Sequence, residues 1–276
     1  MDLESFNTSR ESLVPLLALN NKSNKNIIIF PTDKEAIEFS TDFSNLNKNI
    51  FHLPSWDTLS YDSFVPSFDI QGKRLEIAHL LLTNNNYNIA TSIKAISQRI
   101  YFEELEICKI ELNEEIDFDS LIENLIHLKY QRKDRVESKG SFAIRGGQLD
   151  VYPINYDLPL RVIFDGDLVN EIKTFDTISQ RSISEKKDIL IVPATELFKI
   201  KHSDILNLSS NKKENLDDYE LFQYSQNLDL EKCLLDLTSN VALHIVDKNI
   251  VDNQLKEIID IEKDTFENLK QYFSLE

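Results

Sequence analysis

The stretch GSFAIRGGQLDVYP at residues 140–153 contains three of the chain's five glycines and carries Arg145 within an otherwise hydrophobic strand pattern. Apolar and polar residues alternate on either side of Gly146–Gly147, which is typical of two strands that each bury one face. The paired glycines predict a bulge or a tight bend between them. The alternation places Phe142 and Ile144 on one face and Arg145 on the other.

The residues that follow continue this β-rich pattern. Short strand patterns recur at 160–164, 168–175 and 188–193, and DGD at 165–167 predicts a hairpin turn. Residues 129–192 carry 11 Lys/Arg against 10 Asp/Glu, whereas the rest of the chain carries 19 against 37. This asymmetry indicates a separate unit. We therefore predict a small, mainly antiparallel β-rich (α+β) domain at 129–193.

The sequence on either side of this domain alternates strand and helix patterns. Strand patterns before it lie at 26–30, 49–53, 87–91 and 107–112. A strand pattern at 241–247 and a helical pattern at 251–273 come after it. Such alternation is typical of a parallel α/β sheet. The predicted fold class is α/β, with a parallel-sheet domain in two segments, 1–128 and 194–276, interrupted by the β-rich insert.

Composition excludes several classes of function. The net charge of −17, from 30 basic and 47 acidic residues, repels nucleic-acid phosphate and opposes autonomous DNA binding. No run of apolar residues is long enough to span a membrane, so we expect no membrane partner. The N-terminus lacks the basic start and apolar run of a secretory signal. The two cysteines, far apart in sequence, fit free thiols in a reducing cytoplasm.

We find no motif for catalysis, a cofactor or a metal. The turn after the first strand, IIIFPTDKEAI at 27–37, has no glycine and no Gly-Lys-Ser/Thr, so it does not predict a phosphate-binding loop. The five histidines share no metal-ligand spacing, and no G-x-S-x-G motif is present. The sequence therefore predicts neither an ATPase nor a hydrolase.

Two stretches resemble motifs of the bacterial transcription-repair coupling factors (Mfd). Residues 53–82 are similar to the family pattern W-[DE]-x-L-P-Y-[DE], then S-P and an R-L-x-x-L helix, although Leu59-Ser60-Tyr61 departs from L-P-Y. Residues 130–183 are similar to the next family segment, Y-x-R-x-x-x-V-x-x-x-G-x-F-A-x-R-G, then D-x-[FY]-P, P-x-R, a hairpin, F-D and Q-R-S. The residues in register are Tyr130, Arg132, Val136, Gly140, Phe142, Ala143, Arg145, Gly146, Asp150, Pro153, Pro159, Arg161, Phe164, Phe175, Asp176, Gln180, Arg181 and Ser182.

The resemblance implies the N-terminal module of this family, which is similar to the excision-repair helicase UvrB. It implies a degenerate helicase-like (RecA-like) α/β domain interrupted by a β-rich domain that binds UvrA. UvrB has a phosphate-binding loop where this chain has FPTDKEA at 30–36, so the resemblance favours the coupling factors. Those proteins are several times longer and bind RNA polymerase and double-stranded DNA through parts lacking here. An excised N-terminal fragment is therefore expected.

The function that the resemblance implies is recruitment of UvrA to RNA polymerase stalled at DNA damage, in transcription-coupled nucleotide excision repair. The module itself would be non-catalytic, whereas the full-length relatives are ATP-dependent DNA translocases. The alternative is a UvrB-like module that binds damaged DNA or uses ATP, which nucleotide binding or salt-dependent DNA retention would support. A third possibility, an unrelated hydrolase, is favoured by no motif.

Two arginines are the first candidates for the UvrA-binding surface. In the family, the arginines of F-A-x-R-G and of P-x-R help to form this surface, which implies that role for Arg145 and Arg161. The planar guanidinium suits an acidic partner site through bidentate hydrogen bonds. Arg145 has a second interpretation, an ion pair with a neighbouring acid such as Asp150 within the sheet.

Three further residues are candidates on the same basis. Many relatives have two adjacent phenylalanines after P-x-R, where this chain has Phe164-Asp165, so Phe164 is the expected aromatic contact. Asp176 and Arg181 have two equal interpretations: contact with UvrA, or closure of a turn in the β-rich domain.

Overall fold

The computed structural model describes residues 25–45, 49–58, 64–98, 105–196 and 241–273, with side chains up to Ile261 in the last helix. These residues form two compact units. Unit 1 contains the described residues before Ser67, from Ile77 to residue 98, and from residue 241 onward. Unit 2 contains Ser67–Glu76 and the described residues between 105 and 196. Leu59-Ser60-Tyr61, Cys233 and His202 lie outside the described residues.

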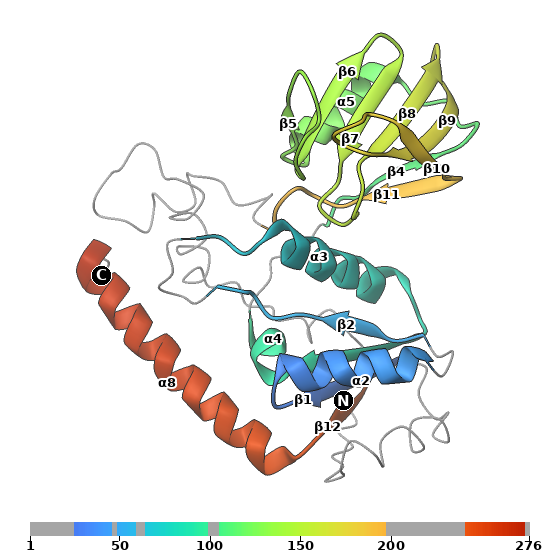
Figure 1. The fold of residues 1–276 in the computed structure, drawn as a ribbon. Coiled ribbons are helices and arrows are strands. Elements are labelled where there is room, and N and C mark those ends of the chain that lie inside the picture. The colour runs from blue at the N-terminus through green and yellow to red at the C-terminus, as the bar shows by residue number, and fades with distance from the viewer. Residues whose placement is uncertain (1–24, 46–48, 59–63, 99–104, 197–240, 274–276) are drawn as a thin grey trace. The chain divides into compact units, whose positions relative to one another are not determined.

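Unit 1 contains a parallel sheet of strand order β12-β1-β3-β2 (Figure 1). Its strands are β1 (Lys25–Phe30), β2 (Phe51–Leu53), β3 (Tyr87–Ser92) and β12 (Ala242–Ile245). In β1, residues 27–30 are all buried, as expected for a strand covered on both faces. The predicted parallel sheet, and its use of strands far apart in the sequence, is confirmed for these four strands.

The helices of unit 1 alternate with its strands, as the α/β pattern predicts. They are α2 (Asp33–Asn45), α4 (Ile93–Ser97) and α8 (Lys248–Phe273), together with the C-terminal part of α3 (Phe68–Thr83). In α2, Ala36, Phe39 and Phe43 face the core, and the Phe30 and Phe39 rings lie 5.1 Å apart between centroids. Ser92 caps the start of α4, because its hydroxyl accepts a hydrogen bond from the Ala95 amide (3.0 Å).

Unit 2 contains a six-stranded sheet of order β10-β9-β8-β7-β6-β5. Its strands are β5 (Gln131–Arg132), β6 (Ser141–Arg145), β7 (Gln148–Tyr152), β8 (Leu160–Asp165), β9 (Leu168–Phe175) and β10 (Ser182–Glu185). All neighbours are antiparallel except β5 and β6. The mainly antiparallel sheet expected here is thus confirmed, including the hairpin turn between β8 and β9.

The glycine pair at 146–147 forms a tight hairpin turn. Arg145 pairs with Gln148 across a two-residue loop, and Gly146 has a φ of +61°, which favours glycine. The sheet's register shifts elsewhere, between Ile163 and Phe164 of β8 and between Ser182 and Ser184 of β10. Of the two expected alternatives, the structure therefore contains the tight bend and not the bulge.

The strand predicted at 107–112 does not join the parallel sheet. It forms β4 (Cys108–Glu111), which pairs antiparallel with β11 (Asp188–Ile191) in unit 2, next to α5 (Phe118–His127). The residues of β4 alternate buried and exposed, so this strand buries one face only, unlike β1. Unit 2 accordingly begins before the expected boundary at residue 129, because β4 and α5 share its core.

The N-terminal half of α3 also belongs to unit 2. Arg74 Nε donates a hydrogen bond to Glu196 Oε1 (3.0 Å), and the two side chains are 0% and 3% exposed. The Gln71 carboxamide oxygen accepts hydrogen bonds from the Glu196 amide and the Thr195 hydroxyl. An isolated buried charge is costly and a paired one is tolerated, so Arg74 and Glu196 depend on each other. Unit 2 is therefore built from two separate stretches of sequence.

Candidate partner-binding surface

The sheet of unit 2 has one apolar face and one polar face. The apolar face packs against α5, β4 and β11, and Figure 1 shows α5 lying against the sheet. Buried residues of this face include Phe142, Leu149, Val151, Leu160 and Val162. Because side chains alternate along a strand, the residues between them point to the opposite face. That opposite face, called the polar face below, carries Arg145, Gln148, Asp150, Arg161 and Lys173, together with a small buried cluster of Ala143, Phe175 and Val136 against which Tyr152 packs.

A row of four charged residues crosses the polar face, with two basic residues between two acidic ones. Asp150 lies opposite Arg161, Arg161 opposite Lys173, and Lys173 opposite Glu185. Arg161 donates two hydrogen bonds to Asp150, from Nε to Oδ1 (2.7 Å) and from Nη2 to Oδ2 (2.9 Å). This bidentate contact raises the pKa of Arg161 further above its already high value.

Arg161 is held by two more residues on this face. Its guanidinium lies 4.5 Å from the centre of the Phe175 ring, and Nη1 donates to the Gln180 carbonyl (3.1 Å). Its side chain is 14% exposed, and that of Asp150 is 5% exposed. Gln148 Nε2 also donates to both carboxylate oxygens of Asp150. Arg161 is therefore fixed in position and offers little of its surface to solvent.

Arg145 lies on the same face and is exposed. Its Nη2 donates to the Asp134 carbonyl (3.2 Å). The ion pair with Asp150 that we considered for Arg145 is wrong, because Arg145 lies opposite Gln148, and Asp150 lies between Ala143 and Arg161. The two-residue glycine turn dictates the register of β6 and β7, so the position of Arg145 opposite Gln148 could have been derived from the hairpin.

Phe164 lies in the core and not on the surface. It is 8% exposed, and its ring meets that of Phe118 edge-on at 4.9 Å between centroids. The alternation along β8 places Phe164 on the apolar face of the sheet, with Leu160 and Val162. Phe164 therefore packs in the core on the apolar face of β8, and it does not form the expected surface contact.

Asp176 and Arg181 bound the turn that joins β9 to β10. The Asp176 carboxylate accepts hydrogen bonds from the amide (2.7 Å) and hydroxyl (2.8 Å) of Ser179, and these bonds lower the pKa of Asp176. The Asp176 amide donates to the Arg181 carbonyl (3.0 Å). Among the described residues, we find no hydrogen bond or ion pair of the exposed Arg181 guanidinium. Asp176 therefore closes the turn, and Arg181 offers a charged side chain at its end.

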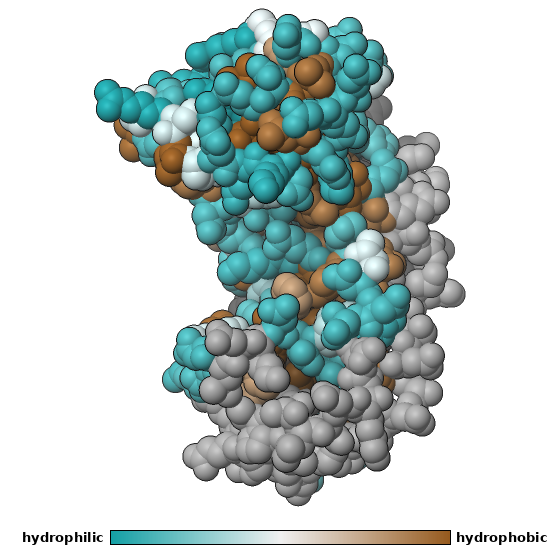
Figure 2. Space-filling model, turned by 90° about the vertical axis from the view of Figure 1, so that its right-hand side faces the viewer, coloured by the Kyte–Doolittle hydropathy of each residue, from teal (hydrophilic) through white to brown (hydrophobic). Residues whose placement is uncertain are grey.

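Arg135 was not predicted, although it contacts the same turn. Its Nη2 donates to the carbonyls of Thr177 (2.7 Å) and Ile178 (3.1 Å). No spacing or motif in the sequence points to this contact, because its acceptors are backbone oxygens. On the space-filling surface, unit 2 is mostly hydrophilic, with smaller hydrophobic areas between the polar side chains (Figure 2).

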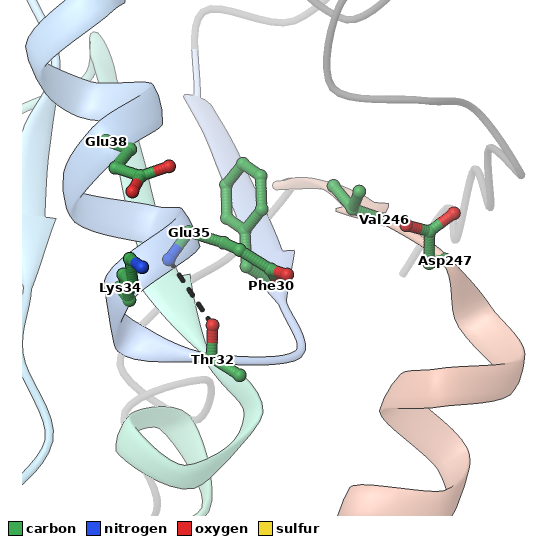
Figure 3. Close-up of a pocket in the computed structure, with 7 residues that line it drawn as sticks. All are labelled: Phe30, Thr32, Lys34, Glu35, Glu38, Val246 and Asp247. Carbon is green, nitrogen blue, oxygen red and sulfur yellow. Dashed lines mark hydrogen bonds between the residues drawn. The ribbon is translucent and has the colours of Figure 1, made fainter.

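Unit 1 contains a pocket of about 340 Å³ after β1. Figure 3 shows it between the end of β1, the start of α2 and the residues that follow β12. The lining residues are Phe30, Thr32, Lys34, Glu35, Glu38, Val246 and Asp247. The end of such a strand, with a helix N-terminus beside it, is where α/β sheets bind nucleotide phosphates.

The chemistry of this pocket opposes a phosphate. Three carboxylates line it against one lysine, and Asp33 and Glu35 already occupy the first turn of α2, where the helix dipole favours an anion. The Asp33 carboxylate is in turn held by the Ser55 amide (3.2 Å). In the part of the chain that the structure describes, no group of three side chains could hold a metal ion. Nor is any described helix long and apolar enough to cross a membrane.

Comparison with known proteins gives the relatives of this chain. Residues 108–197 match the family model of the UvrB interaction domain. The chain is 29% identical over 174 residues to the transcription-repair-coupling factor of Escherichia coli (strain K12), which covers 62% of this chain and 15% of that protein. It is 26% identical over 289 residues to the transcription-repair-coupling factor of Bacillus subtilis (strain 168). That alignment covers 90% of this chain and 24% of that protein.

A second group of relatives is more distant. The chain is 22% identical over 215 residues to UvrABC system protein B of Thermosipho africanus, covering 71% of this chain and 32% of that protein. Together these similarities confirm the resemblance that the motifs indicated. The chain spans less than a quarter of the length of the two coupling factors.

Proposed function

We propose that this chain, a relative of the transcription-repair-coupling factors with a UvrB interaction domain at residues 108–197, is the part of such a factor that recruits UvrA. Its role would be in transcription-coupled nucleotide excision repair, in the cytoplasm. Contacts with RNA polymerase and double-stranded DNA would belong to other parts of a longer protein.

The observation that carries this proposal is the polar face of the unit 2 sheet. It belongs to the matched domain, and the apolar face of the same sheet is already covered. Arg145 and Arg161 both point to it, and Arg181 lies at the end of the adjoining turn. We propose that Arg145 and Arg181 contact UvrA directly, while Arg161, Asp176 and Phe164 hold the surface in shape.

We also propose that unit 1 is a degenerate helicase-like (RecA-like) domain without catalytic activity. Its parallel sheet supports the helicase-like assignment, and the acidic lining of its pocket disfavours ATP binding. The UvrB-like alternative, a module that binds damaged DNA or uses ATP, has no comparable support, because neither pocket charge nor net charge suits a polyphosphate.

The test is a calorimetric titration of this chain with UvrA from the same bacterium. The parent chain should bind saturably, and the Arg145→Ala/Arg181→Ala variant should bind at least about tenfold more weakly, because interface arginines are frequent hot spots. Arg132→Ala is the matched control: Arg132 is exposed and lies opposite Phe142, on the other side of the sheet.

The outcomes separate the hypotheses. Loss of binding in the double variant, with the control unchanged, supports UvrA recruitment through this face. No binding by the parent chain contradicts the proposal. Retention of ATP or of a labelled damaged duplex by the same parent chain would instead favour the UvrB-like alternative.

A further inference from the structure

The turn between β9 and β10, residues Asp176–Arg181, is rigidly built from within. Besides the two bonds from Ser179 to the Asp176 carboxylate, the Gln180 amide donates to the Asp176 carbonyl (2.8 Å). The Gln180 side chain donates to the Thr177 carbonyl (2.8 Å). Gln180 itself has a φ of +60°, which non-glycine residues rarely adopt and which the surrounding contacts must maintain.

Two arginines also hold this β9–β10 turn from outside. Arg135, which precedes β6 in the chain, donates to the carbonyls of Thr177 and Ile178, and Arg161 of β8 donates to that of Gln180. Arg161 is itself anchored by Asp150 and Phe175. The conformation of the turn is thus fixed by residues far from it in the sequence, including one that the family motif contains.

The turn presents one apolar side chain to solvent. Ile178 is 86% exposed, more than any other large hydrophobic residue that the structure describes. A single exposed hydrophobic residue is ordinary by itself. Here, however, the backbone on both sides of Ile178 is held by hydrogen bonds, so burial of its side chain on a partner would cost little ordering.

We infer that Ile178 is the apolar anchor of the UvrA-binding surface and inserts into an apolar pocket of UvrA. This inference rests on the proposed function and names the residue that carries much of the binding. Arg135, which contacts the Ile178 carbonyl, and Arg181, at the end of the same turn, together with Arg145 on the polar face, fit an acidic rim around that pocket. Arg161 is then a positioning residue, because it contacts the turn and leaves little surface for UvrA.

The experiment is the same titration of this chain with UvrA, using Ile178→Ala and Ile178→Asp. We expect Ile178→Ala to bind about tenfold more weakly than the parent chain and Ile178→Asp to show no measurable binding, with unchanged melting temperatures. Ile126→Ala is the matched control, since Ile126 is 54% exposed on α5, which covers the opposite face of the sheet.

A double-mutant cycle tests the positioning role of Arg161. If Arg161 acts through the turn, Ile178→Ala should cause a much smaller further loss in the Arg161→Ala background than in the parent chain. Full additivity of the two losses would contradict that role, and a merely destabilised sheet would not produce the coupling.

Each outcome is decisive for one claim. Parent-like affinity of Ile178→Ala, in a chain whose binding still depends on Arg145, would overturn the anchor and leave UvrA recruitment standing. Failure of the parent chain to bind UvrA would overturn the recruitment proposal and this inference with it.

Discussion

Arg145 and Arg161 show how two arginines on one face of a sheet acquire different roles. Arg161 is opposite an acid, over an aromatic ring and beside a carbonyl, so its charge is fully used inside the protein. Arg145 lies at the strand end, opposite Gln148, and keeps its guanidinium in solvent apart from one carbonyl contact. The first arginine maintains a surface, and the second is available to a partner.

This difference predicts unequal effects on stability. Replacement of Arg161 by alanine leaves the buried Asp150 carboxylate without its main partner, which should destabilise unit 2 by about 2–4 kcal/mol. The value lies toward the low end for buried pairs because Arg161 keeps some contact with solvent. Hydrogen exchange of the β7 and β8 amides in the variant and the parent chain measures the loss.

Two further variants test whether the loss of stability comes from the unpaired Asp150 carboxylate. Arg145→Ala should change the same free energy of opening by no more than about 0.5 kcal/mol, as exposed substitutions usually do. Asp150→Asn in the Arg161→Ala background should recover part of the loss, because it removes the unpaired charge. Equal protection in the parent chain and the Arg161→Ala variant would show that the pair contributes nothing.

At the scale of elements, the helix α3 is fixed to unit 2 by a very close approach. A Cβ atom at Gly72 would lie 2.5 Å from the Ile154 carbonyl oxygen and 2.7 Å from its carbon, both backbone atoms. Glycine in mid-helix is unfavourable by about 1 kcal/mol relative to alanine. Its presence here is therefore explained by the lack of a side chain, which lets the two backbones approach.

We therefore expect Gly72→Ala to destabilise the protein despite its better helix propensity. Overpacking against backbone typically costs about 1–3 kcal/mol, which outweighs the propensity gain. Urea denaturation followed by circular dichroism measures the change. Lys73→Ala, at an exposed position of the same helix, should be close to neutral, and a stabilised Gly72→Ala variant would refute the close approach.

The elements show where sequence patterns are sufficient. The strands of the parallel sheet could be predicted because each is a short apolar run followed by a helical pattern. The antiparallel hairpins could be predicted because Gly146–Gly147 and DGD at 165–167 mark their turns. The strand β4 was assigned to the wrong sheet, since its partner β11 comes more than seventy residues later and nothing local identifies it.

The candidate surface was only partly predictable for related reasons. Motif resemblance indicated the arginines, but not that Asp150 neutralises one of them, which depends on strand register. The motif indicated Phe164 as a surface aromatic, although the alternation along β8 places it on the buried face with Leu160 and Val162. Arg135 binds backbone carbonyls, so no complementary side chain could reveal it.

At the scale of the whole molecule, we expect the two units to differ in what they bind. We expect Mg-ATP to leave the melting temperature of the chain unchanged, because three carboxylates and one lysine make the lining of the pocket in unit 1 net negative. A ligand at about 100 times its dissociation constant would stabilise the folded state by about 2.7 kcal/mol, a readily measured shift. Differential scanning fluorimetry with millimolar Mg-ATP is the measurement.

A neutralised pocket provides the control for this result. The Glu35→Gln/Glu38→Gln variant lacks two of the three carboxylates. If the shape of the pocket suits a nucleotide and only its charge opposes binding, Mg-ATP should raise the melting temperature of this variant. A saturable rise in melting temperature of the parent chain would show that it binds ATP and would contradict this expectation.

The interleaving of the two units has a consequence for synthesis on the ribosome. All the described elements of unit 2 have been made when residue 196 is added, whereas β1 lacks its neighbour β12 until residue 245. At about 5–20 residues per second, this gap of 49 residues lasts about 2–10 s. During that interval the inserted unit can fold to completion while its host still has an open sheet edge, so the partner-binding face matures first.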